Sequence, residues 1–200
     1  MTQLTINYFD VNKAAQLVFF FLKKSTERHM NITKLRLVKW LYLCERASYE
    51  EFGEPLTGDK LGALRHGPVL SETLALIEGT SRAFPGNPWE NIIKVNREPK
   101  HQYVSLPKNC KYQSIQDLDR FSDAELELIE SIWEKYNGWS AKSLERHLHD
   151  SKFFPEWRWK EGDGTNWIDI ETILKVVGFD ETAIEPMVKN IVTFNAQRTQ

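Results

Sequence analysis

The sequence has few cysteines and no long apolar run. Its two cysteines, Cys44 and Cys110, are too few for the disulfide framework of a small secreted protein. No signal peptide is recognisable, so we expect a reducing, cytoplasmic location. The longest apolar run, residues 17–22, is far shorter than the ~20 residues that cross a bilayer. We therefore expect no membrane association.

An excess of charge of one sign is also lacking. The chain carries 26 basic and 28 acidic side chains, a formal net charge of −2. Such a balance produces no overall field that attracts nucleic acid. Lys34, Arg36 and Lys39 give one helix a basic beginning, but Glu50 shares their face. Binding to nucleic acid is therefore not expected from charge.

Motifs for catalysis or metal binding are missing as well. The chain has no phosphate-binding glycine loop, nucleophile elbow or H-E-x-x-H sequence. His147 and His149 are two residues apart on an expected helix and so point to opposite sides. Glu161 and Asp163 alternate as in an EF-hand, but Asn166 stands where that loop needs glycine. We predict no catalytic residue, no metal and no cofactor, and hence no enzyme.

The densest pattern that is present predicts a long central helix over about residues 33–52. Thr33 is a suitable N-cap, while Gly53 and Pro55 end the helix. The apolar stripe is wider than that of a surface helix, which places the helix between several neighbours. The centre of that stripe comprises Leu37, Val38, Leu41, Cys44, Ser48 and Phe52, and it is widened by Leu35, Trp40, Tyr42, Ala47 and Tyr49. The solvated strip is expected to comprise Arg36, Lys39, Arg46 and Glu50.

Two elements are expected to follow the central helix. Gly67 as N-cap and Pro68 at the first helical position predict a helix that runs to Glu78. Farther on, alternating apolar residues predict a small β-hairpin over about residues 91–106, with its turn at 97–100. Prolines exclude a long helix between residues 80 and 107.

Capping signals predict the remaining helices. Asp10 can cap a first helix, whose exit loop is expected from Lys23 onward, and Ser122 with Glu125 forms a capping box. Similar signals precede helices near residues 140 and 169, and Pro186 can open a last helix over about 186–196. The predicted fold is mainly α, a compact bundle of six or seven helices around the helix at 33–52, with one β-hairpin.

An ordered set of motif residues runs through the chain: Leu41, Tyr42, Gly53, Pro55, Leu56, Asp59, Gly67, Pro68 and Val69. In order and spacing this set resembles a known family, the Panacea domain of SocA-like antitoxins and related phage-associated proteins of the GepA type. The resemblance covers about residues 10–178 of a single domain, 1–200, and leaves the helix at 186–196 peculiar to this chain.

The resemblance implies an antitoxin that neutralises a protein toxin encoded by a neighbouring gene through direct binding. Some members of the family are instead proteolytic adaptors, which would need a protease or chaperone as a further partner. A phage-associated DNA-binding or regulatory protein is the alternative from another class.

Two segments are candidates for partner binding. Arg65 and His66 flank an expected rigid corner and can reach solvent. Phe154, Trp157 and Trp159 lie in a loop that is dense in aromatic residues, of the kind favoured at protein interfaces. For these rings, core filling and partner binding remain equally open.

Overall fold

The central element is the helix α2 (Lys34–Phe52), and a computed structural model describes residues 9–98 and 101–198 around it. The Thr33 side chain accepts a hydrogen bond from the backbone N–H of Arg36. Gly53 ends the helix with φ 69°, a left-handed conformation that glycine adopts at little cost. The prediction of a capped helix at 33–52 is confirmed.

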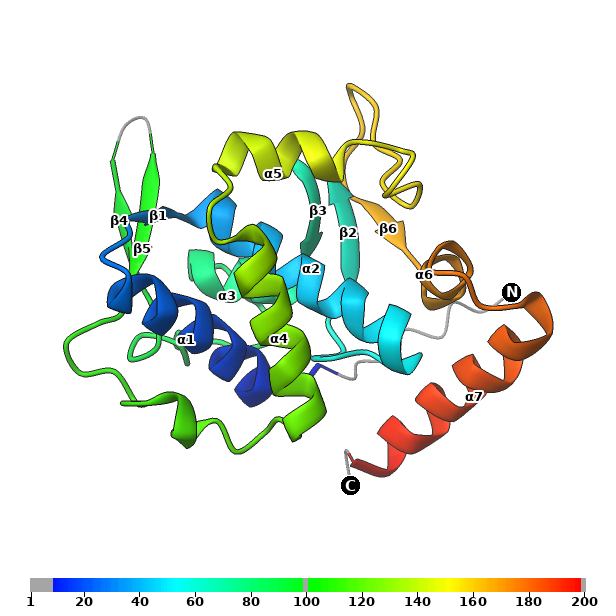
Figure 1. Ribbon diagram of the computed structural model, residues 1–200, viewed down its shortest axis with the longest axis horizontal. Coiled ribbons are helices and arrows are strands. Elements are labelled where there is room, and N and C mark those ends of the chain that lie inside the picture. The colour runs from blue at the N-terminus through cyan, green and yellow to red at the C-terminus, as the bar shows by residue number, and fades with distance from the viewer. Residues whose placement is uncertain (1–8, 99–100, 199–200) are drawn as a thin grey trace.

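Helices surround α2 on several sides (Figure 1). α2 contacts α1 (Val11–Glu27), α4 (Asp123–Tyr136), α5 (Ala141–Leu148) and α6 (Ile170–Val176). The first helix thus continues through Lys23, where an exit loop was expected. α4 begins with the predicted capping box of Ser122 and Glu125. A neighbour on each side explains why the apolar surface of α2 is so wide.

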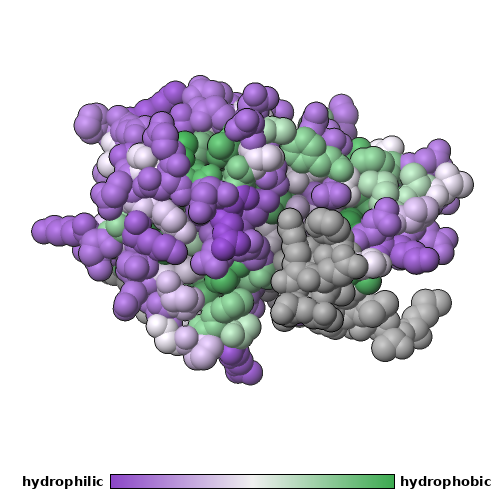
Figure 2. Space-filling model, turned by 90° about the horizontal axis from the view of Figure 1, so that it is seen from below, coloured by the Kyte–Doolittle hydropathy of each residue, from purple (hydrophilic) through white to green (hydrophobic). Residues whose placement is uncertain are grey.

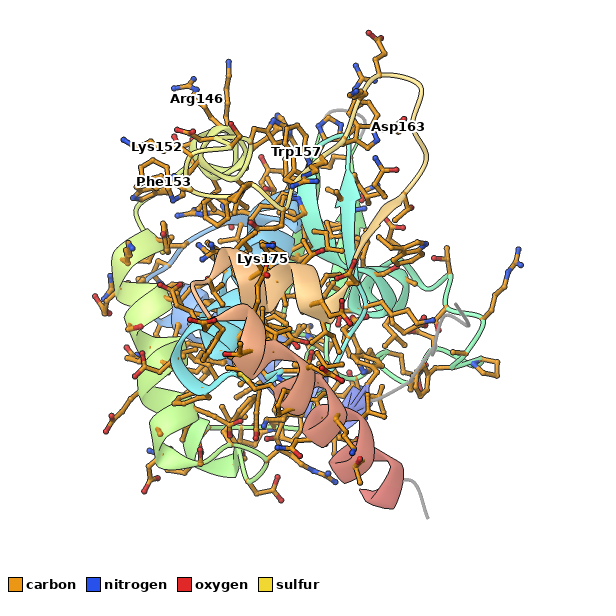
Figure 3. The ribbon with its side chains drawn as sticks, turned by 90° about the vertical axis from the view of Figure 1, so that its right-hand side faces the viewer. Arg146, Lys152, Phe153, Trp157, Asp163 and Lys175 are labelled. Carbon is orange, nitrogen blue, oxygen red and sulfur yellow. The ribbon has the colours of Figure 1, made fainter. Side chains whose placement is uncertain are left out.

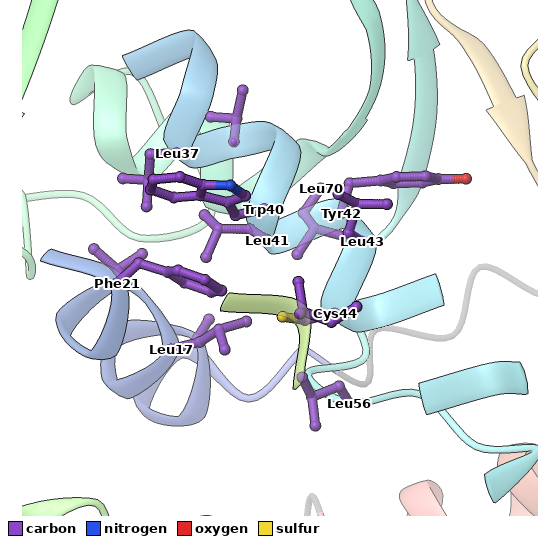
Figure 4. Close-up of a cluster of buried hydrophobic side chains, with 14 of the residues drawn as sticks. Leu17, Phe21, Leu37, Trp40, Leu41, Tyr42, Leu43, Cys44, Leu56 and Leu70 are labelled. Carbon is purple, nitrogen blue, oxygen red and sulfur yellow. The ribbon is translucent and has the colours of Figure 1, made fainter. Parts of the chain in front are cut away.

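The core lies between α1, α2 and α4. Trp40 of α2 is fully buried; its ring stacks on Phe21 with centroids 5.3 Å apart and meets Trp133 edge-on at 5.4 Å. Leu41, which is 1% exposed, lies in the same cluster (Figure 4). Burial of these side chains is the main favourable contribution to the stability of the fold.

Two three-stranded antiparallel sheets accompany the helices, so the prediction of a helical bundle with one hairpin is wrong. One sheet has the order β1 (Ile32–Thr33), β5 (Gln102–Ser105), β4 (Lys94–Arg97). Its β4–β5 pair is the predicted hairpin; residues 99–100 of the expected turn lie outside the described residues. The other has the order β3 (Gly67–Leu70), β2 (Leu61–Leu64), β6 (Asn166–Ile168).

The second sheet replaces the first turns of an expected helix. Gly67 and Pro68 belong to strand β3, and the helix α3 (Ser71–Glu78) begins only after Leu70. Proline has no N–H to donate to a neighbouring strand, and β3 is an edge strand of its sheet. The same Gly-Pro pair therefore fits either a helix start or an edge strand, and pairing with β2 decides in favour of the strand.

The last helix also differs from the prediction. α7 (Glu181–Arg198) begins five residues before Pro186, which lies inside it. Pro186 is exposed and cannot donate to the carbonyl of residue 182. The other short element is the 3-10 helix η1 (Ile115–Asp117). Within the described ranges, no helix combines the length and the hydropathy that a membrane span requires.

Candidate functional site

Three segments that are distant in sequence meet beside α2, at the top of Figure 1. They are the tip of the β2–β3 hairpin, helix α5, and the segment 149–160, which together we call the α5 surface. His66 Nδ1 lies 2.7 Å from Glu145 Oε1, which joins the tip to α5. Trp157 Nε1 donates a hydrogen bond of 2.9 Å to the carbonyl of Leu64, which joins the loop to the tip.

Arg65 and His66 form the tip of the hairpin. Both are exposed, and the His66 side chain retains 65% of its accessible surface. Gly67, the first residue of β3, follows with φ 99°, a positive value that glycine adopts at little cost. The hairpin thus presents a guanidinium and an imidazole to solvent on a fixed backbone.

The three candidate aromatic residues have different environments. Trp157 is half-buried, and its ring stacks on His149 with centroids 3.8 Å apart and planes 6° apart. Trp159 donates instead to the carbonyl of Gly164, at 3.1 Å, and closes its own loop. Phe154 is only 4% exposed and belongs to the core. The fold therefore brings Trp157, but neither of the other two rings, to Arg65 and His66.

A buried carboxylate holds the segment 149–160 against α2. Glu156 is 3% exposed, and its Oε1 accepts hydrogen bonds of 2.8 Å from Tyr42 Oη and from Arg46 Nε. Burial, followed by the charge of Glu156, raises the pKa of Tyr42. The Arg46 guanidinium also donates to the carbonyl of Phe153, at 3.1 Å. These contacts fix the loop, so its exposed side chains are presented with little conformational freedom.

A buried lysine lies beneath the hairpin tip. Lys39 is completely buried, and its Nζ donates a 2.9 Å hydrogen bond to the carbonyl of Pro68. Burial lowers the pKa of Lys39 to about 7, and Glu145 opposes this effect. The placement of Lys39 in a solvated strip is wrong, because strand β3 covers that face of α2. Sequence periodicity could not show this, since β3 was expected to be a helix.

Gly67 leaves room for two nitrogen atoms. A Cβ added there would lie 3.0 Å from Lys39 Nζ and 3.4 Å from His149 Nε2. His149 Nε2 is buried and has no hydrogen-bond partner among the described residues. Burial lowers the pKa of His149, and Glu145 opposes the shift. Lys39, Glu145 and His149 thus form a polar group beneath the tip that sequence analysis missed; only the spacing of 145 and 149, one turn of helix, hinted at a shared face.

Several residues of the sequence motif have structural roles. Asp59 accepts hydrogen bonds from the backbone N–H groups of Glu72 and Thr73, at 2.9 and 2.7 Å. It therefore caps α3, whose own N-cap residue offers no side-chain hydrogen bond. The other motif residues are core residues, turn residues or strand residues: Leu41 and Tyr42 in the core, Gly53 and Pro55 after α2, Gly67, Pro68 and Val69 in β3.

Glu45 holds the turn that contains this motif. It is fully buried and accepts hydrogen bonds from Thr57 N, Thr57 Oγ1 and Gly58 N, at 2.9, 2.7 and 3.0 Å. Burial raises the pKa of Glu45 to about 7, against the opposing effect of these three donors. Sequence analysis did not single out Glu45, because a Glu within a helix is ordinarily solvated.

Two further aromatic residues near α5 are exposed: Phe153, in the loop that is dense in aromatic residues, and Trp139, which was expected to be a core or capping residue. Trp139 retains 36% and Phe153 retains 50% of its accessible surface. Trp139 directly precedes Ser140, the N-cap of α5, and its exposure depends on packing that one sequence does not reveal. In the described part of the chain, no group of three or more His, Cys, Asp or Glu side chains could hold a metal ion. The accessible groups of the site are rings and cations suited to noncovalent contact.

The chain folds into helices and two antiparallel sheets, an α+β scaffold that presents charged and aromatic side chains on an ordered surface. The chain belongs to the family described as Antitoxin SocA-like, Panacea domain, whose family model matches residues 37–158. No curated protein and no solved structure matches the chain. The match lies within the expected region 10–178; the wider extent and the single-domain boundaries 1–200 remain predictions.

Proposed function

We propose that this protein is the antitoxin of a toxin–antitoxin system and neutralises its cognate protein toxin by direct binding. Family membership carries the proposal: the matched residues 37–158 include the hairpin tip, α5 and Trp157. An antitoxin of this kind has a non-enzymatic role, and its partner would be encoded by a neighbouring gene. Reduced Cys44 and Cys110 fit action in the cytoplasm.

Within this proposal the α5 surface contacts the toxin. Arg and aromatic residues are enriched at protein interfaces, and the surface offers Arg65, His66 and Trp157. Trp157 contributes chiefly by holding the hairpin tip, through its bond to Leu64 and its stacking on His149. Phe154 and Trp159 are assigned supporting roles, since one is buried and the other is bonded within its own loop.

Co-expression with the neighbouring gene tests the proposal. The wild-type chain should restore growth and form an isolable complex with the toxin. Arg65→Ala should weaken the complex by roughly thirtyfold, the effect of losing about 2 kcal/mol at an interface anchor. Lys189→Ala, at an exposed position of α7, is the matched control and should bind normally. A toxin that is neutralised without any contact with this chain would contradict the proposal.

The same assay separates direct neutralisation from proteolytic delivery. Growth should be restored equally in a host that lacks its ATP-dependent proteases, because binding alone inhibits the toxin. Loss of rescue in that host, with the complex still formed, would show that the chain is an adaptor. A duplex DNA gel shift examines the regulatory alternative, for which the net charge of −2 gives no support.

A further inference from the structure

An exposed cluster of rings lies at the side of α5 that faces away from the hairpin tip. The His147 ring lies between Trp139, at a centroid distance of 5.2 Å, and Phe153, at 5.6 Å. Phe153 is 50% exposed and Trp139 is 36% exposed, which makes them two of the most exposed large apolar side chains among the described residues. Trp139 and Phe153 are thus joined through the ring of His147, and contiguous exposed apolar surface marks sites of protein interaction.

The cluster is held in place from below. His147 also packs against the buried Phe154, with centroids 5.0 Å apart, and Trp139 packs edge-on against the buried Tyr136 at 5.2 Å. Trp139 and the half-buried His147 ring therefore each pack on a buried ring, and the exposed Phe153 packs on His147. A surface whose rotamers are fixed before binding loses less entropy when a partner binds.

Cations border these rings. Lys152 Nζ lies 5.5 Å from the centre of the Phe153 ring, and Lys135 Nζ lies 5.2 Å from that of Tyr136. Arg146 is exposed on α5 beside His147. Figure 3 shows Arg146, Lys152 and Phe153 together around α5, at the upper left of the view.

The local charge is opposite in sign to that of the whole chain. Residues 135–152 contain four basic and two acidic side chains, a local charge of +2 in a chain of −2. One of the two acids, Glu145, is already paired with His66. Burial lowers the pKa of His147, and the charge of Lys135 adds to the shift, as expected in a positive environment. The surface thus combines apolar rings with excess positive charge.

We propose that this aromatic–cationic patch, formed by Trp139, His147, Phe153, Lys135, Arg146 and Lys152, docks an acidic segment of the toxin. Carboxylates of that segment pair with the cations, while a large apolar side chain between them lies on the exposed rings. The inference depends on the proposed antitoxin function and specifies the chemistry of its partner. A compact set of three cations with Asp150 among them suits a short acidic peptide better than the regular phosphates of a nucleic acid.

Charge reversal tests the patch. In the full-length chain, R146E combined with K152E should weaken binding of the purified toxin by roughly a hundredfold and slow association most at low salt. The control, K108E combined with K189E, makes the same change of net charge at two exposed positions on other elements. It should leave binding within about threefold of wild type. Phe153→Ala should weaken binding by roughly tenfold with little change of salt dependence.

The outcomes are distinguishable. If wild type, the control and the R146E/K152E variant all bind the toxin equally tightly, the patch is not the binding site. The antitoxin proposal would then remain intact. A wild-type chain that does not bind the toxin would overturn both. Steeply salt-dependent binding of random duplex DNA, lost in R146E/K152E, would assign the patch to nucleic acid and overturn the inference. A thermal melt of each variant must match that of wild type for a loss of binding to count in its favour.

Discussion

Lys39 and Glu45 lie on the same helix, and both are fully buried. Each has a pKa shifted to about 7, from opposite directions. Glu45 holds a proton in the folded chain between pH 4.5 and about 7 that the unfolded chain has lost, so its contribution to stability falls as pH rises there. Lys39 affects stability above pH 7, and its contribution to stability rises with pH there.

Lys39→Met should therefore change how stability depends on pH. Between pH 7 and 10.5 the unfolded chain binds a proton that folded Lys39 has released, so the free energy of unfolding should rise with pH. The slope is at most about 1.4 kcal/mol per pH unit for one proton. Lys39→Met should remove this rise, because Met fills a similar volume without ionising. Urea unfolding between about pH 7 and 9.5 measures it.

Lys175→Met, at an exposed position, is the control and should retain the wild-type slope. Parallel stability curves for wild type and Lys39→Met would mean that Lys39 keeps an ordinary pKa in the folded protein.

At the scale of elements, local signals located most helices correctly. The caps of α2 and the capping box of α4 are each made by residues within a few positions of one another, so the sequence contains the whole signal. The sheet β3-β2-β6 is different. Its hairpin starts at Leu61, and β6 pairs with it from residues 166–168, about a hundred positions later. No local sequence pattern indicates that a strand pairs with another strand so far away in the sequence.

The candidate site, too, could be predicted only where local sequence determines it. Arg65 and His66 could be placed at the surface from the turn sequence alone. The burial of Lys39 follows from the position of β3, and the exposure of Phe153 depends on Arg46 and Glu156 holding its loop. Each of these depends on contacts between residues that are distant in sequence, which periodicity within one helix does not contain.

Two glycines that end helices offer a test of how α7 packs. Gly53 and Gly79 both have φ 69°, but their surroundings differ. A Cβ on Gly53 would lie 2.3 Å from Met187 Cε of α7, whereas nothing lies within 4 Å of one on Gly79. Gly79→Ala should cost about 1 kcal/mol, the conformational penalty alone. Gly53→Ala should cost roughly 1 kcal/mol more, because Met187 must move. Denaturant titration of both variants gives the comparison.

Met187→Ala serves as the control for the extra cost. In a chain that already carries this substitution, Gly53→Ala should cost about the same as Gly79→Ala, so the double mutant should lose about 1 kcal/mol less stability than the sum of the two single mutants. Equal costs for the two glycines in the wild-type background would show that α7 does not pack on the end of α2 in solution.

In the molecule as a whole, the apolar core and the surface proposed for binding lie in different places. Apolar burial is concentrated around α2, while the α5 surface and the aromatic–cationic patch lie at one end (Figures 1 and 3). Viewed from below, outside the atoms drawn in grey, hydrophilic residues predominate and hydrophobic ones lie in separate groups (Figure 2). Substitutions in the core and in the patch should therefore affect different quantities.

Leu41→Ala is the core substitution that tests this separation. Leu41 is 1% exposed, so truncation should lower the free energy of unfolding by about 2–5 kcal/mol, a large part of the 5–15 kcal/mol typical of a folded protein. Well below the melting temperature, the folded molecules should bind the toxin with the wild-type Kd, because no patch residue has changed. R146E/K152E should show the reverse, a normal melt and a weakened complex.

Melting curves of both variants, together with toxin-binding titrations at a low and a high temperature, show whether core stability and toxin binding change independently. If Leu41→Ala weakened binding at the low temperature as much as R146E/K152E does, with its chains fully folded, α2 would transmit its packing to the binding surface. Core and surface would then act as one unit. Independent effects would instead mean that the binding surface keeps its shape when the core has lost much of its stability, as expected if local contacts such as those of Lys39 and Glu156 hold it.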